Sequence, residues 1–251
     1  MNVGILGSGS WATAIAKMLC TNVDTLHWWV RSEETATELQ QYGHNPRHSQ
    51  SISLPTTKLH VTTDMQAVVD ACDALVVAIP SLYLNDVFRE RNIQGFASKV
   101  VFSAIKGMVA EYDSIPARYL HKEFDLPYDN IGMICGPCHA EEVAREKLSY
   151  LTVACPNLDH AEAFAELLET RYIRVQTTHD VVGAELAAVL KNVYAIAAGI
   201  AHIDSMFADW LRRIDDGDVL TRADRLEFRR NQVQTNEPAM VFLAPGFHGQ
   251  D

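Results

Sequence analysis

The sequence predicts an α/β fold built on a doubly wound, mostly parallel sheet. Short apolar runs of strand length recur along the chain, and helix-favouring segments separate them. The first turn, GSGSWA at residues 7–12, places glycines between an apolar run and an alanine-rich segment. Strands that alternate with helices in this way are typical of parallel α/β sheets.

The glycine turn has the spacing of the dinucleotide-binding fingerprint G-x-G-x-x-G/A. Gly7 would allow the sharp turn and Gly9 the close approach of a pyrophosphate, while the small Ala12 would allow the helix to pack closely on the strand. The free N–H groups at the start of the helix would then face the phosphates. The turn therefore predicts a Rossmann-like first βαβ unit.

The run at residues 25–30 predicts the second strand, which ends at Arg31. The residue at this strand end helps to choose the cofactor, because an acid binds the ribose hydroxyls and an arginine accommodates a 2′-phosphate. Arg31 therefore leaves both NAD and NADP open. Glu33 and Glu34 follow, and we interpret them as the solvated first turn of the next helix.

Later apolar runs continue the pattern. The run DALVVAIP, residues 73–80, has the composition of a central parallel strand that is buried on both faces. Pro80 lies where open α/β sheets bind ligands, although a proline that merely ends the strand fits equally well. Lys106 follows another strand, where it either reaches an anionic substrate or is solvated. Further strands are predicted at 60–62, 99–103, 130–135, 152–154 and 172–175, helices at 65–71 and 159–169, and a long surface loop at 43–55.

The composition changes near residue 180 and predicts two regions. Residues 1–179 form a dinucleotide-binding domain, and residues 180–251 form a short helical region that is a truncated or divergent substrate domain. The alanine-rich stretch 181–201 predicts one long, largely buried helix, and a second helix is expected at 206–214.

Three polar residues stand out in the alanine-rich stretch, namely Glu185, Lys191 and Asn192. A buried charge needs a partner, a ligand or a cavity. Burial lowers the pKa of a lysine and lets it exchange protons near neutral pH. A lysine that extends to solvent or forms a structural pair is the equal alternative for Lys191.

Composition excludes several classes of protein. The formal charge of −11 and the isoelectric point near 5.3 argue against nucleic acid or an anionic membrane as the main partner. The most apolar late segment carries Lys191 and Asn192, so we expect no membrane span, and the N-terminus has no basic region typical of a signal peptide. We therefore expect a cytoplasmic protein whose cysteines are reduced thiols: Cys20, Cys72, Cys135, Cys138 and Cys155.

The segment CGPCH contains a C-x-x-C pair, Cys135 and Cys138, followed by His139. This pattern also fits a thioredoxin-like dithiol or covalent haem attachment. A redox dithiol would come early in a thioredoxin-like unit, and covalent haem would require export. We therefore prefer a loop at a strand end that holds two thiols.

Several separated motifs together resemble one family. They are GILGSGSWATA (4–14), WVR (29–31), AIPS (78–81), SAIKG (103–107), Gly136-Pro137 with Ala140 and Glu142, and GAEL (183–186) leading to LKNV (190–193). In order and spacing over about the first 200 residues, the chain resembles bacterial-type NAD(P)-dependent glycerol-3-phosphate dehydrogenase, its N-terminal domain and the start of its C-terminal domain.

The resemblance implies hydride transfer between NAD(P)H and dihydroxyacetone phosphate, giving sn-glycerol 3-phosphate for glycerophospholipid synthesis. It implies that Lys191 exchanges the proton at the substrate oxygen and that Lys106, Asn192 and Gly136 bind a small phosphate substrate. It implies NAD or NADP as the cofactor, no metal ligand, and a homodimer as the candidate assembly. The implied cofactor contacts are Gly7, Gly9, Ser10, Trp11, Arg31, Pro80, Lys106 and Ala140.

The chain departs from the family pattern in two places. Cys138-His139 stands where the family usually has Ser-Phe, and the match fails after residue 202. The family continues there into a helical substrate domain that supplies an aspartate, a threonine and an arginine. Residues 217–221 and 229–231 echo a later motif in altered order, which we interpret as chance. The alternative function is therefore an NAD(H)-binding fragment without turnover.

Overall fold

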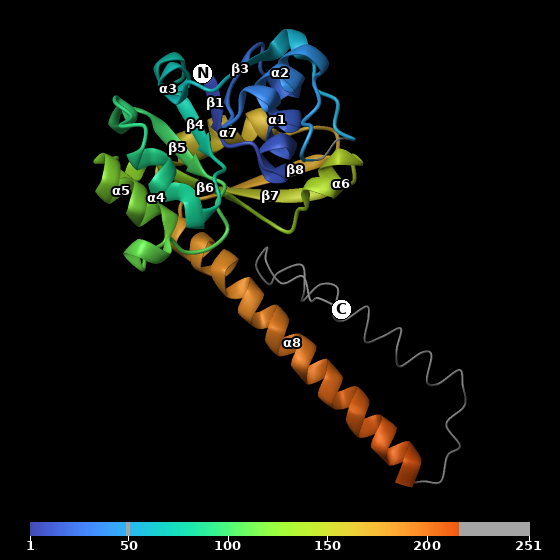
Figure 1. The fold of residues 1–251 in the computed structure, drawn as a ribbon. Helices are drawn as coiled ribbons and strands as arrows, with labels where there is room; N and C mark the ends of the chain where they lie inside the picture. The colour runs from blue at the N-terminus through green and yellow to red at the C-terminus, as the bar shows by residue number, and fades with distance from the viewer. Residues whose placement is uncertain (49–50, 216–251) are drawn as a thin grey trace. The chain divides into compact units, whose positions relative to one another are not determined.

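The computed structural model describes residues 1–48 and 51–215. The chain divides into one unit, Met1–Ala188, and a second that begins at Val189. The first unit contains an eight-stranded sheet in the order β3-β2-β1-β4-β5-β6-β7-β8 (Figure 1). The strands are β1 (Val3–Leu6), β2 (Leu26–Trp29), β3 (Leu59–Thr62), β4 (Ala74–Val77), β5 (Val100–Ser103), β6 (Ile131–Cys135), β7 (Ser149–Ala154) and β8 (Ile173–Thr178).

Neighbouring strands of this sheet run parallel except β6 and β7, which pair antiparallel. The predicted doubly wound, mostly parallel sheet is therefore confirmed. The chain order reverses between β1 and β4, which places a topological switch point there. Leu6, at the end of β1, is level with both Trp29 and Val77, so the carboxyl ends of β1, β2 and β4 meet at one edge. Open α/β sheets bind ligands at such an edge.

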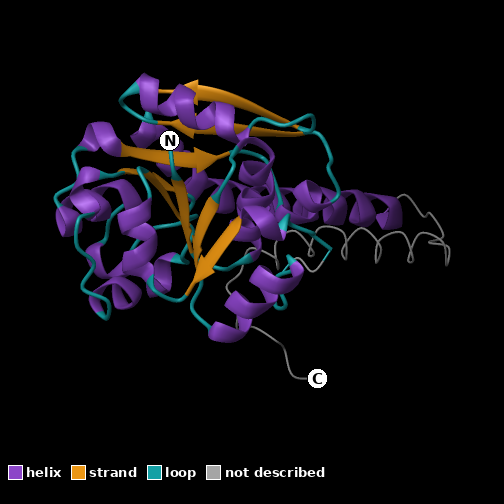
Figure 2. Cartoon of the chain, turned by 90° about the horizontal axis from the view of Figure 1, so that it is seen from above, coloured by secondary structure: helices purple, strands orange, loops and turns teal. Residues whose placement is uncertain are grey.

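Helices cover both faces of the sheet (Figure 2). They are α1 (Ser10–Asn22), α2 (Glu33–Tyr42), α3 (Met65–Ala71), α4 (Ser81–Arg89), α5 (Pro116–Phe124), α6 (Ala140–Ala144) and α7 (Leu158–Leu168), with short 3₁₀ turns at Thr56–Lys58, Phe96–Ser98, Ala110–Tyr112 and Tyr128–Asn130. The sequence analysis predicted α1, α2, α3 and α7 but no helix at α4, α5 or α6. The residues of α4 and α5 are strongly amphipathic, so the sequence carried a helix signal there that the analysis missed, whereas α6 has five residues and is too short for a clear helical repeat.

Two hydrophobic cores lie on the two faces of the sheet. Ile5 belongs to the core that contains Ile15 of α1 and Phe164 of α7. Its neighbour Leu6 belongs to the core that contains Leu84 of α4 and other side chains of α3 and α5. Because successive strand residues point to opposite faces, the continuous apolar run of β1 fills both cores. This burial fixes the strand ends that carry the candidate site.

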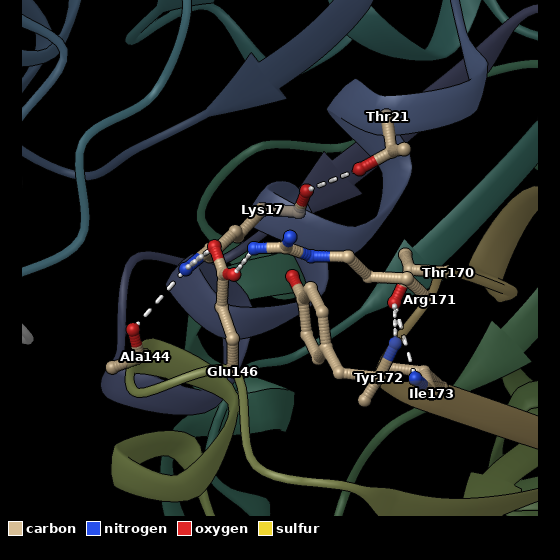
Figure 3. A network of polar contacts seen from close by, with 8 residues as sticks. All are labelled: Lys17, Thr21, Ala144, Glu146, Thr170, Arg171, Tyr172 and Ile173. Atoms are coloured by element: carbon tan, nitrogen blue, oxygen red, sulfur yellow. Dashed lines mark hydrogen bonds and ion pairs between the residues drawn. The ribbon is translucent and has the colours of Figure 1, made fainter.

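Charged side chains tie the far end of α1 to the sheet edge (Figure 3). Lys17 forms an ion pair with Glu146 at 3.2 Å and donates a hydrogen bond to the carbonyl oxygen of Ala144 at 3.1 Å. Arg171, which precedes β8, pairs with the same carboxylate. These two cations lower the pKa of Glu146. The network holds α1 at the end opposite to its glycine turn.

The last described element is α8 (Val181–Asp215), a single helix that begins in the first unit and continues into the second. Two helices were predicted here. Residues 202–205 contain neither glycine nor proline, so nothing in the sequence interrupts the helix.

The apolar surface of α8 is largely exposed, so the prediction of a buried helix is wrong. The exposed side chains are Val182, Leu186, Leu190, Val193, Tyr194, Ile196 and Ile200. The apolar composition of α8 indicates that the helix packs against other apolar groups. The composition does not show which element or molecule provides those groups.

The expectation about a membrane span also needs correction. Residues 181–202 of α8 have a mean hydropathy of 1.5, and by length and composition alone this segment is long and apolar enough to cross a bilayer. One lysine, Lys191, does not offset so many apolar side chains. The core helix of a globular domain has the same length and composition, so this property is weak evidence for a membrane.

Candidate dinucleotide site

The turn between β1 and α1 requires glycine at Gly7. Its φ of +127° lies in a region that other residues rarely adopt, and a Cβ there would lie 2.4 Å from the carbonyl oxygen of Ala78. The Gly7 N–H donates to the carbonyl oxygen of Trp29 at 3.1 Å. Its own carbonyl oxygen accepts from the buried Trp28 indole at 2.6 Å. Strands β2 and β4 thus hold the turn from both sides.

The helix start that follows is open. Gly9 is the N-cap of α1, and no described side chain caps the helix there. No described atom lies within 4 Å of where a Cβ of Gly9 would stand. The first turn of α1 holds no acidic residue. Free N–H groups and the positive end of the helix dipole therefore face a space that suits an anion.

A cavity of about 310 Å³ lies in front of this turn. It collects residues that follow β1, β2 and β4, together with part of the loop after α2, and two exposed arginines give it cationic character. Arg47 is paired with Glu34 of α2 at 2.7 Å. The lining includes Gly7, Ser8, Gly9, Trp29, Arg31, Ser32, Thr35, Asn45, Arg47, His48, Ala78, Ile79, Pro80 and Tyr83.

Asn45 is a site residue that the sequence analysis missed. Its fully buried side chain donates to the carbonyl oxygen of Ser8 and to the hydroxyl of Thr13, both at 2.9 Å. Its amide oxygen accepts from the backbone N–H groups of Arg47 at 3.1 Å and His48 at 3.2 Å. The residue thus pins the loop to the glycine turn. The Asn-Pro pair in a turn-rich segment was the signal available, because asparagine often bonds its own loop backbone.

Lys106 and Trp11 meet although they are distant in the sequence. Lys106 follows β5, and its Nζ lies 5.2 Å from the centroid of the Trp11 ring in the first turn of α1. The Trp11 indole N–H is buried and has no hydrogen-bond partner among the described residues. A buried donor without a partner is costly unless a ligand or water accepts from it. This observation fits a polar cofactor beside Trp11.

The remaining predicted contacts follow neighbouring strands. Pro80, Lys106 and Gly136 come after β4, β5 and β6, whose carboxyl ends lie at the same edge because these strands are parallel. Gly136 has a φ of +141°, and a Cβ there would lie 2.6 Å from the carbonyl oxygen of Tyr150. Ala140 begins the short helix α6 just beyond this turn. Pro80, Lys106 and Gly136 thus lie at the same edge of the sheet as Gly7, which follows β1.

The thiols Cys135 and Cys138 are not activated for redox chemistry. Both are free, and burial raises the pKa of each thiol. Lys106 offsets this rise only in part for Cys135, and a hydrogen bond with Ser149 together with Lys106 offsets it only in part for Cys138. Dithiols that react readily have a lowered pKa instead. The raised pKa values therefore agree with the preferred interpretation of a loop that holds two thiols.

The buried carboxylate of Glu185 accepts a hydrogen bond within the first unit. Glu185 is 1% exposed, and its carboxylate accepts from the backbone N–H of Ala117 at 3.0 Å. Ala117 lies in the first turn of α5, just after Pro116, so the carboxylate caps this helix. Burial nevertheless raises the pKa of Glu185 to about 7. The group is structural in the first unit.

Lys191 and Asn192 belong to the second unit. Lys191 is exposed, so the interpretation as a buried lysine is wrong and burial supplies no reason for acid–base chemistry. The role of both residues remains a prediction from family resemblance. Residues 217–221 and 229–231 lie outside the described residues.

Comparison with known proteins identifies the family. The family model described as NAD-dependent glycerol-3-phosphate dehydrogenase N-terminus matches residues 2–161. The chain belongs to the NAD-dependent glycerol-3-phosphate dehydrogenase family. The resemblance stated from the motifs is therefore confirmed.

Curated relatives in this family include glycerol-3-phosphate dehydrogenase [NAD(P)+] of Limosilactobacillus reuteri, 34% identical over 203 residues, and that of Lysinibacillus sphaericus, 36% identical over 203 residues. The alignments cover 78% and 79% of this chain. The chain spans 59% of the length of each relative.

Solved glycerol-3-phosphate dehydrogenases share the fold. The Plasmodium falciparum enzyme matches with a TM-score of 0.72 and 21% identity, over 94% of this chain and 64% of its own. The Coxiella burnetii enzyme matches with a TM-score of 0.69 and 23% identity, over 97% and 70%. At these identities the comparison supports the architecture alone.

Proposed function

We propose that this chain binds NAD(H) or NADP(H) in the cavity at the end of β1, β2 and β4. One observation carries the proposal: the uncapped start of α1 follows a turn that only glycine can make. Gly7, Gly9, Ser10 and Trp11 would hold the diphosphate, and Arg31 the ribose or its 2′-phosphate. Pro80, Lys106 and Ala140 would line the path toward the nicotinamide.

We further propose an oxidoreductase that interconverts dihydroxyacetone phosphate and sn-glycerol 3-phosphate. When bound, the nicotinamide supplies or accepts the hydride. Lys106, Asn192 and the Gly136 turn would bind the phosphate substrate, and Lys191 would protonate its carbonyl oxygen as negative charge grows there. The names of the relatives support this reaction. A cytoplasmic enzyme of glycerophospholipid precursor synthesis would follow from it.

A second candidate is a cofactor-binding module without turnover. The observation that favours it is that the matched family model describes the family's N-terminus, over residues 2–161, the part of the chain that contains the glycine turn and its cavity. Such a module would bind the cofactor without converting a substrate.

Two assays on the full chain separate the candidates. NADH fluorescence measures binding, and NADH oxidation with dihydroxyacetone phosphate measures turnover. Binding with turnover supports the enzyme, and binding alone supports the module. Absence of binding by either cofactor contradicts both.

A Lys191→Ala variant tests the acid–base role. We expect turnover to fall roughly 10²–10⁴-fold with NADH affinity unchanged, the usual range for a lost general acid. Lys122→Ala, a change on α5 in the first unit, is the matched control. Full turnover in Lys191→Ala would contradict the role.

A further inference from the structure

A second cavity in the first unit is formed by residues from α5, from the start of α8 and from the edge of the sheet opposite to the glycine turn. Its volume is about 610 Å³, and its lining shares no residue with the cavity in front of Gly7. Pockets for small molecules usually have volumes of roughly 300–1,000 Å³. The size of this second cavity therefore suits a small molecule.

Strand direction separates this cavity from the candidate dinucleotide site. Ile131, in its lining, is the first residue of β6, whereas Gly136 follows the last one. Because β7 pairs antiparallel with β6 and β8 runs parallel to β7, the ends of β7 and β8 lie beside the start of β6. Pro156 and His179, which follow those two ends, also line the cavity. Since β6 spans roughly 13 Å, these strand ends lie well away from the edge that carries the glycine turn.

The walls of the cavity are largely apolar. Ile131 is fully buried and Val181 is 5% exposed, whereas Val182, the next residue of α8, is 54% exposed. The apolar lining thus extends from the core of the first unit out to solvent. An apolar group that entered the cavity would remove this surface from water, which is favourable.

Arg118 gives the cavity a positive charge. This residue of α5 is exposed, and no acidic side chain among the described residues forms an ion pair with it. Asp180 shares the lining, but its carboxylate accepts from the backbone N–H of Gly183 at 2.8 Å and so caps the start of α8. His179 adds a ring N–H that can donate a hydrogen bond. The polar part of the lining therefore suits a single anionic group.

We propose that this cavity binds a monocarboxylate with an apolar chain. The chain would lie against Ile131, Val181 and Val182, and the carboxylate would accept hydrogen bonds from the guanidinium of Arg118. Such pairs form two parallel N–H···O bonds. One guanidinium balances one negative charge, which favours a carboxylate over a phosphate dianion. The proposal does not rest on cofactor binding, because the two cavities share no residue.

Calorimetric titration of the full chain with decanoate, below its micelle concentration, tests the proposal. We expect saturable binding of one molecule. Octanoate lacks two CH₂ groups and should bind roughly 15-fold more weakly. Decanol has an apolar chain of the same length without the charge and should bind roughly tenfold more weakly. The absence of saturable decanoate binding overturns the proposal, as does equal affinity for decanol and decanoate.

Arg118→Ala tests the charge. We expect the affinity for decanoate to fall roughly tenfold and the affinity for decanol to stay the same. Arg89→Ala, which removes an exposed arginine from the last turn of α4, is the matched control and should bind decanoate as the wild type does. Unchanged decanoate affinity in Arg118→Ala overturns the proposal.

Val182→Glu tests the apolar wall, because it places a carboxylate where the chain of the ligand would lie. We expect decanoate binding to weaken at least tenfold with unchanged circular dichroism. The matched control, Val193→Glu, makes the same change at an exposed position of α8 that does not line the cavity. Equal loss in both variants would assign decanoate to the surface of α8 and overturn the proposal. Competition between NADH and decanoate would assign the ligand to the cofactor cavity and also overturn it.

Discussion

The Asn45 side chain donates a hydrogen bond to the carbonyl oxygen of Ser8 at 2.9 Å, which joins positions 37 residues apart. This contact holds the loop after α2 against the glycine turn. Gly43, with a φ of +69°, ends α2 and lets the loop begin its return. The wall of the cavity thus depends on the fully buried amide of Asn45.

Removal of this amide should weaken cofactor binding. In Asn45→Ala, the Ser8 carbonyl and the Thr13 hydroxyl lose a donor in a buried place, at a cost of about 1–3 kcal/mol in unfolding free energy. We expect a lower urea midpoint and a higher NADH dissociation constant. Asn2→Ala, at an exposed position, is the control. An unchanged midpoint and affinity would show that the loop is held by other contacts.

Substitution of Gly7 should abolish the site. Gly7→Ala combines a disfavoured φ of +127° with a Cβ 2.4 Å from the Ala78 carbonyl oxygen, so the backbone must move. We expect loss of NADH fluorescence enhancement and a lower thermal midpoint. Gly95→Ala is the matched control, since Gly95 has a φ of +72° but no described atom within 4 Å. Gly95→Ala should lower the free energy of unfolding by only about 1 kcal/mol and leave NADH binding intact. Equal effects of the two variants would contradict a steric requirement at Gly7.

Arg31 should favour the 2′-phosphate of NADPH. In Arg31→Ala we expect the affinity for NADPH to fall about tenfold while the affinity for NADH changes little, because only the former carries the extra anion. The difference should shrink at high salt, since Arg31 is exposed. Fluorescence titrations with both cofactors measure this. Arg118→Ala changes a residue at a different cavity, and it should leave the ratio of NADPH affinity to NADH affinity unaltered. Equal loss for both cofactors would contradict selectivity through Arg31.

Glu185 should make stability depend on pH. Its pKa is about 7 in the folded protein against 4.5 for the unperturbed group, so the folded state binds more protons between these values. The contribution of Glu185 to the free energy of unfolding is therefore greatest below pH 4.5. This contribution decreases by about 3 kcal/mol as the pH rises to about 7.

Glu185→Gln should remove that dependence, because glutamine stays neutral and still accepts from the Ala117 N–H. Urea unfolding at pH 5 and pH 8 measures the difference. We expect the free energy of unfolding to decrease less between pH 5 and pH 8 in the variant than in the wild type. Glu162→Gln on α7, an exposed change, is the control. If the free energy of unfolding decreases equally in Glu185→Gln and in the wild type, groups other than Glu185 produce the pH dependence.

The sequence predicted the local elements well where the pattern was strong. Apolar runs such as β4 located strands, and the glycines at 7 and 9 located the first turn, because backbone conformation and burial on two faces constrain those residues directly. The helices α4 and α5 were missed although their residues are strongly amphipathic, and α6 was missed because five residues are too few to show a helical repeat.

The sequence by itself determined the alternation of strands and helices, the glycine turn and the family motifs. Only the tertiary structure decided that Trp11 meets Lys106, that Asn45 closes the cavity wall, and that apolar side chains of α8 are exposed. The physical reason is distance along the chain. A turn or a strand depends on neighbouring residues, whereas these contacts depend on which strands lie side by side and on what covers a helix.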